Sequence, residues 1–65
     1  MKPFEKDVVL PRLREANLRF GAVTGVTLAA LNGWSERTTR QWLRRLEMAG
    51  FVMRPLGDRS GWLVR

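Results

Sequence analysis

Residues 31–52 read LNGWSERTTRQWLRRLEMAGFV, and this stretch decides the fold. After an Asn-Gly pair, Ser35 stands where the N-cap of a helix belongs, and neither glycine nor proline interrupts the chain before Gly50. At 100° per residue, one side of the stretch collects residues suited to a core, namely Thr39, Leu43 and Leu46. The pattern predicts a helix over about 36–49 with this side buried.

The opposite side of the same helix is basic. Opposite the core side lie Arg37, Gln41 and Arg44. Arg40 and Arg45 lie on the two flanks. Acidic residues at helical spacing are few, so only Glu36 with Arg40 and Glu47 with Arg44 are expected to pair, for about 0.2–0.5 kcal/mol each. Most of the positive charge is therefore expected to remain unneutralised by the chain.

Two helices are predicted before this one. The first runs over about 7–19, with Asp7 as its N-cap and Gly21 as its terminator, and Pro11 implies either a start close to it or a local kink. A brief extended piece over about 22–24 leads into a short helix over about 26–32. Thr24 or Thr27 caps this short helix, and Asn32-Gly33 ends it.

The segment after Gly50 alternates β-prone runs with turn residues. Phe51 to Leu56 and Gly61 to Val64 flank Gly-Asp-Arg-Ser, which predicts a hairpin over about 51–65 with Arg59 at its tip. Pro55 cannot donate to a strand ladder, so its strand is an edge or ends there.

Charge points to a polyanionic partner. The 65 residues carry twelve Lys+Arg against six Asp+Glu, a formal net charge of +6, and ten of the twelve are arginine. The guanidinium group is a flat fork of donors that matches both phosphate and the edge of guanine. The alternative is that the charge only keeps a small domain soluble.

Composition also excludes several classes of function. Cysteine and histidine are absent, which removes disulfides, thiolate metal sites and the commonest general base, so neither an enzyme nor a metal or other cofactor is predicted. No apolar run approaches the roughly 20 residues that span a bilayer, and we expect no membrane association and a cytoplasmic location.

The stretch VTGVTLAALNGWSERTTRQWLRRLEMAGFVMR, residues 23–54, resembles the centre of the winged helix-turn-helix DNA-binding family. The shared features are a short helix, a Gly-containing turn, Ser-x-Arg-Thr at the start of a third helix, and Leu-x-x-Leu-x-x-x-Gly before a strand. The likeness extends over about residues 8–65. It implies one domain over residues 1–65 that is mainly α with a small β-hairpin, a three-helix winged helix-turn-helix.

The resemblance implies duplex DNA binding, by a transcriptional regulator or a phage or mobile-element protein. The third helix would enter the major groove, and the hairpin would lie on the backbone or in the minor groove. The residues so assigned are Ser35, Arg37, Thr38, Arg40, Gln41, Arg44, Arg45, Arg54 and Arg59. The alternatives are a winged-helix module that contacts an acidic protein, or binding to RNA, and a homodimer or a larger protein partner stays open.

Two roles are open to the three tryptophans: packing in the core and stacking on unpaired bases. In so small a domain Trp42 and Trp62 are expected in structural roles. Trp34 stands in a turn, and its role stays open.

Overall fold

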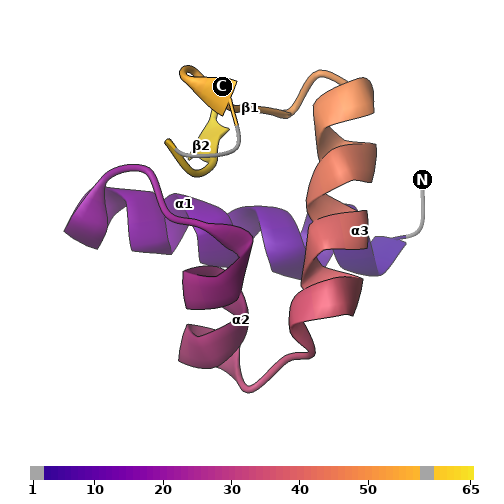
Figure 1. Ribbon diagram of the computed structural model, residues 1–65. Coiled ribbons are helices and arrows are strands. Elements are labelled where there is room, and N and C mark those ends of the chain that lie inside the picture. The colour runs from indigo at the N-terminus through magenta and orange to yellow at the C-terminus, as the bar shows by residue number, and fades with distance from the viewer. Residues whose placement is uncertain (1–2, 58–59) are drawn as a thin grey trace.

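The computed structural model describes residues 3–57 and 60–65. Helices make up most of this part, and a two-stranded antiparallel sheet closes it, so the fold class predicted from the sequence is confirmed. The elements in chain order are a π-helical segment η1 (Glu5–Val9), α1 (Leu10–Phe20), α2 (Gly25–Asn32), α3 (Glu36–Met48), β1 (Val52–Met53) and β2 (Leu63–Val64). The helix α1 runs across the molecule, and α2 and the hairpin lie towards opposite ends of α3 (Figure 1).

The first helix differs from its prediction at its start. Helical backbone precedes Asp7 and includes Phe4, so Asp7 lies inside a turn and is not the N-cap. Over Glu5–Val9 the helix is wound as a π-helix, in which Leu10 donates its backbone N–H to the carbonyl of Glu5. Because Pro11 lacks an N–H and its ring crowds the preceding turn, a widened turn in front of it accommodates the proline. Of the two predicted alternatives, the local distortion is the one observed.

The starts of α2 and α3 follow the sequence signals closely. The Thr24 hydroxyl accepts a hydrogen bond from the backbone N–H of Thr27 at 3.1 Å, which makes Thr24 the N-cap of α2. Ser35 does the same for α3, accepting from the N–H of Thr38 at 3.3 Å. Gly33, with φ of +69°, ends α2 in the left-handed conformation that glycine adopts without strain.

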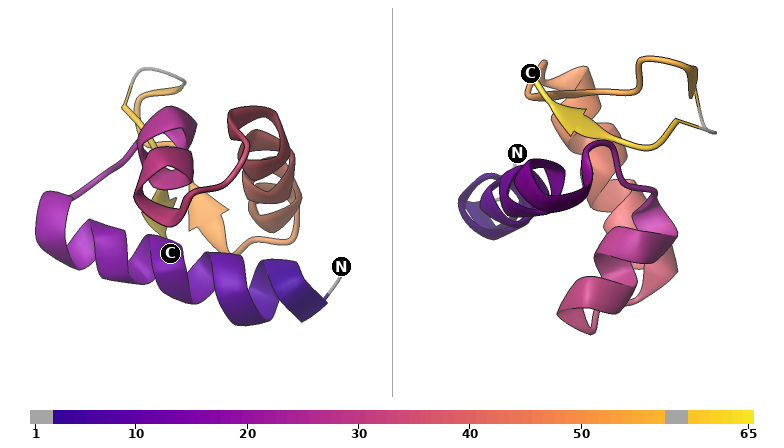
Figure 2. Two further views of the ribbon diagram at one scale, coloured as in Figure 1. Left: turned by 90° about the horizontal axis from the view of Figure 1, so that it is seen from below. Right: turned by 90° about the vertical axis from the view of Figure 1, so that its left-hand side faces the viewer.

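The core forms where α1, α2 and α3 meet, beneath the hairpin (Figure 2). The side of α3 predicted to be buried is buried: Leu43 and Leu46 are 0% exposed. Thr39 is equally buried, and its hydroxyl donates to the carbonyl of Ser35 at 2.8 Å, so this polar group is satisfied inside the core. The other fully buried large side chains are Leu13, Leu28, Val9, Val52 and the unexpected Glu5.

Aromatic side chains extend this core. Trp62 is buried, and Trp42 is half-buried, as predicted. Trp34 is also half-buried and meets Trp42 edge-on with ring centroids 5.4 Å apart. Phe4, from the N-terminal helix, completes the cluster at 4.9 Å from Trp42. Packing therefore accounts for all three tryptophans.

The hairpin is shorter than predicted, because each strand has only two residues. Val52 pairs with Val64 and Met53 with Leu63, and β1 ends two residues before Pro55. Trp62 then bridges to Val23, which places the predicted extended piece beside the hairpin. At Gly61, with φ of +80°, an added Cβ would stand 2.6 Å from the carbonyl carbon of Val23, so only glycine permits this approach. The predicted tip residue Arg59 lies outside the described residues.

Asn17 fastens the hairpin to α1, a role that was not predicted from the sequence. Its side-chain amide nitrogen donates to the carbonyls of Gly21 at 2.8 Å and Trp62 at 3.0 Å. Its amide oxygen accepts from the backbone N–H of Val64 at 2.9 Å. One side chain thus fixes the end of α1 and the position of β2 together.

The rotation of α3 predicts a contrast between two apolar residues on the same helix. Leu46→Ala should lower the free energy of unfolding by about 2–5 kcal/mol, because it leaves a cavity in the core. Met48→Ala, at a site that is 89% exposed, should change it by no more than about 0.5 kcal/mol. Urea denaturation of both variants measures the difference, and equal stabilities would contradict the observed rotation.

Candidate nucleic-acid interface

The outward side of α3 carries Arg37, Gln41 and Arg44, which we call the outward stripe. All three residues are exposed, and they lie opposite the buried Leu43 side of the helix. Their side chains make no hydrogen bond or ion pair with residues 3–57 or 60–65. The donors of the stripe are therefore available to a partner.

The surface around the stripe is concave on its α2 side. One shallow hollow follows α3 itself, and a second lies where α2, α3 and the hairpin come together. Arg40 and Arg44 line both hollows, so the two are neighbours on the surface. The second hollow is completed by Thr24, Gly25, Val26, Arg54 and Trp62.

Arg40 borders the stripe and is held in place on two sides. Its Nη2 lies 3.1 Å from Oε1 of Glu36, which is the pair predicted from their spacing. Both side chains are about half exposed (55% and 50%), so the pair is weak and can open to another anion. On the other side, a Cβ added at Gly25 would stand 2.9 Å from Cγ of Arg40. The glycine therefore gives Arg40 room to lie across the start of α2.

Gly25 is a residue that sequence reasoning did not assign to the site. Its only signal was its place directly before the short helix predicted over about 26–32. The structure puts Gly25 in the first turn of α2, where most residues are better helix formers. A glycine suits this position because the side chain of Arg40, from α3, packs against it. This contact joins two different helices, so the local sequence pattern does not indicate it.

Arg45 has an internal partner that the sequence pattern did not predict. Its Nη1 donates to Oε1 of Glu5 at 2.7 Å, and Glu5 is 0% exposed. The other carboxylate oxygen, Oε2, is buried without a hydrogen-bond partner in the described part of the chain. Arg45 thus supplies the counter-charge of a buried carboxylate and ties α3 to η1.

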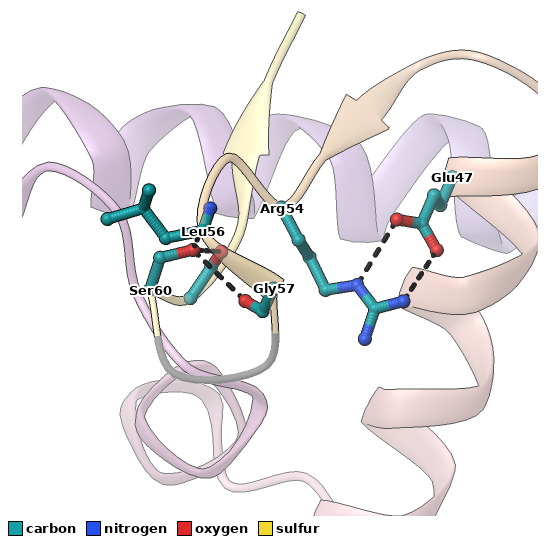
Figure 3. Close-up of polar contacts among 6 residues, drawn as sticks. Glu47, Arg54, Leu56, Gly57 and Ser60 are labelled. Atoms are coloured by element: carbon teal, nitrogen blue, oxygen red, sulfur yellow. Dashed lines mark hydrogen bonds and ion pairs between the residues drawn. The ribbon is translucent and has the colours of Figure 1, made fainter.

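Arg54 is likewise paired with a carboxylate, again near the C-terminal end of α3. Its Nε lies 3.1 Å from Oε2 of Glu47 and its Nη2 lies 3.2 Å from Oε1, a two-pronged pair across the gap between hairpin and helix (Figure 3). Its guanidinium also lies 4.7 Å from the ring centre of Trp62. Glu47 therefore pairs with Arg54, and the predicted pair of Glu47 with Arg44 is wrong. The planar guanidinium of Arg54 faces the carboxylate of Glu47 and makes two hydrogen bonds to it, an arrangement that favours this pair.

The remaining assigned residues are Ser35, Thr38 and Arg59. Ser35 and Thr38 sit at the start of α3, where the Ser35 hydroxyl already serves as the N-cap. Arg59 lies outside the described residues. Near it, the Ser60 hydroxyl accepts from the N–H of Leu56 at 3.0 Å and donates to the carbonyl of Gly57 at 3.1 Å, which closes the turn (Figure 3).

Two kinds of site are absent from the described residues. They contain no group of three or more acidic or other metal-ligating side chains that could hold a metal ion. None of their helices is long and apolar enough to cross a membrane.

Comparisons with known proteins add nothing to this geometry. No family model matches the chain, and searches of curated proteins and of solved structures find no match.

The Glu5–Arg45 pair predicts that Arg45 acts mainly on stability. Arg45→Leu leaves the carboxylate of Glu5 buried without its donor and should lower the free energy of unfolding by about 1–3 kcal/mol. The double variant Glu5→Leu/Arg45→Leu should recover most of that loss, because it removes the buried charge as well.

Arg44→Leu is the matched control, because Arg44 is one position away and has no partner in the part of the chain that the structure describes. It should change the free energy of unfolding by no more than about 0.5 kcal/mol. Urea denaturation separates the variants, and an Arg45→Leu protein as stable as Arg44→Leu would contradict the structural role.

Proposed function

We propose that this protein binds duplex DNA, with α3 in the major groove. The observation that carries the proposal is the outward stripe, in which two arginines and a glutamine project from one helix and have no partner among residues 3–57 and 60–65. An α-helix with its side chains is about 10–12 Å across, and the major groove of B-DNA is about 12 Å wide. A helix side that presents guanidinium and amide groups therefore suits that groove in both width and hydrogen bonding.

The distribution of charge supports a polyanion over a neutral partner. Among the acidic residues that the structure describes, Glu5, Glu36 and Glu47 are each paired with an arginine of the same chain. The arginines that face these carboxylates lie beside the stripe, and the stripe itself keeps its charge. A net charge of +6 then acts at long range to draw the chain to DNA.

The elements around α3 have roles in this proposal. Arg40, on the flank towards α2, is placed for a phosphate of the backbone and not for a base edge, because it leaves the helix sideways against Gly25. The hairpin follows the C-terminal end of α3 and borders the hollow that Arg40 and Arg44 line. In the proposal it contacts the neighbouring backbone or minor groove, and Arg59 would contribute there.

The biological setting is part of the same proposal. A DNA-binding domain of this size suits a transcriptional regulator or a protein of a phage or mobile element. Either would act in the cytoplasm, where such DNA is found.

Salt dependence tests the proposal. Binding to a duplex of random sequence should weaken steeply with salt, with a log–log slope of about −3 to −5 for roughly three to five neutralised phosphates. Arg40→Ala should make the slope about one unit shallower, whereas Arg12→Ala, on the far hollow between α1 and α2, should leave it unchanged. Fluorescence anisotropy measures all three proteins. Absence of binding at about 50 mM salt would instead favour an acidic protein partner.

Glu36 offers a test of opposite sign. This carboxylate sits in the first turn of α3 and holds Arg40, so it both repels phosphate and competes for an arginine. Glu36→Gln should strengthen binding to random duplex by about threefold or more, which corresponds to about 0.7 kcal/mol. The same anisotropy titration detects it, and weaker binding of the variant would contradict the placement of Arg40 on the backbone.

A further inference from the structure

We infer that α3 reads a short site in which a G·C pair, an A·T pair and a second G·C pair follow one another within about four base pairs. The residues that would read them are Arg37, Gln41 and Arg44, in that order. The inference rests on the proposed function and goes beyond it, because it names the DNA sequence that the stripe fits.

Internal contacts reduce the number of side chains able to read bases. Among the described residues, three arginines beside the stripe each pair with a carboxylate of this chain. These pairs are Arg40 with Glu36, Arg45 with Glu5, and Arg54 with Glu47. The three members of the stripe have no such partner among the described residues.

Position on the helix selects the same three residues. Gln41 points almost directly away from Leu43, and Arg37 and Arg44 stand only about 40° and 60° from Gln41 around the helix axis. Side chains opposite the buried side reach deepest into a groove that the helix enters. Flanking side chains meet the walls of the groove, where the phosphates are.

Spacing along the axis sets the length of the site. With about 1.5 Å of rise per residue, Arg37 and Gln41 are separated by about 6 Å, and Gln41 and Arg44 by about 4.5 Å. The total of about 10.5 Å equals about three base-pair steps of 3.4 Å. The three contacts therefore fall within about four consecutive base pairs.

The chemistry of each side chain selects the base. A guanidinium fork has donors only, and N7 and O6 of guanine are the two adjacent acceptors that satisfy it. The amide of glutamine carries a donor and an acceptor side by side, which match N7 and N6 of adenine. Burying Arg37 or Arg44 against any other base pair leaves donors without partners, and this cost excludes the wrong sequence.

Selection from a random duplex library tests the inference directly. The wild-type protein should enrich sites with G·C, A·T and G·C in this order. Arg37→Ala should lose preference at one outer position, Arg44→Ala at the other, and Gln41→Ala at the A·T pair between them. Each loss should be about tenfold or more between the preferred base and its competitors. Arg12→Ala should select the wild-type site.

A change of preference provides a second readout that does not depend on loss of binding. Arg37→Gln should replace the G·C preference at its own position with A·T and leave the other two positions unchanged. Circular dichroism of each variant verifies that it folds as the wild type does.

The outcomes separate this inference from the proposed function. Duplex binding without any G·C preference, or arginine variants that weaken all sequences equally, would overturn the inference and leave DNA binding standing. Failure to bind any duplex at low salt would overturn both.

Discussion

The burial of one side of α3 is the constraint on which the rest of the structure depends. Thr39, Leu43 and Leu46 are all 0% exposed, and a helix fastened at three points over two turns cannot rotate without exposing them. Fixing that side inwards fixes the opposite side outwards, because side chains on a helix are spaced by about 100°. The exposure of the outward stripe is therefore a consequence of core packing, and no separate feature is needed to present it.

In the described part of the chain, the arginines on and beside α3 fall into two groups: those that a carboxylate of the protein holds, and those that are available to a partner. Glu5 and Glu47 bind Arg45 and Arg54 and fasten α3 to the N-terminal helix and to the hairpin. A fully buried carboxylate such as Glu5 is costly without its partner, so its arginine is committed to the fold. The half-exposed Arg40 stands between the two groups, since its pair with Glu36 can exchange for a phosphate at little cost.

The sequence predicted what depends on local signals. The caps Thr24 and Ser35, the buried side of α3 and the presence of a hairpin all follow from residues close together in the chain. Contacts between distant residues were missed, and they decide which side chains are available. Glu5 is 40 positions from Arg45, and nothing in the helical pattern indicates that the two meet. The role of Gly25 likewise depends on an arginine from another helix.

The most direct test of a DNA-binding surface on α3 is an NMR titration of ¹⁵N-labelled protein with a short duplex. Amide shifts should change most at Arg37, Gln41 and Arg44 and at residues of the hairpin, with little change along the Arg12 side of α1. Shift changes centred instead on exposed apolar residues outside α3 and the hairpin, such as Leu31 and Leu18, would contradict the account.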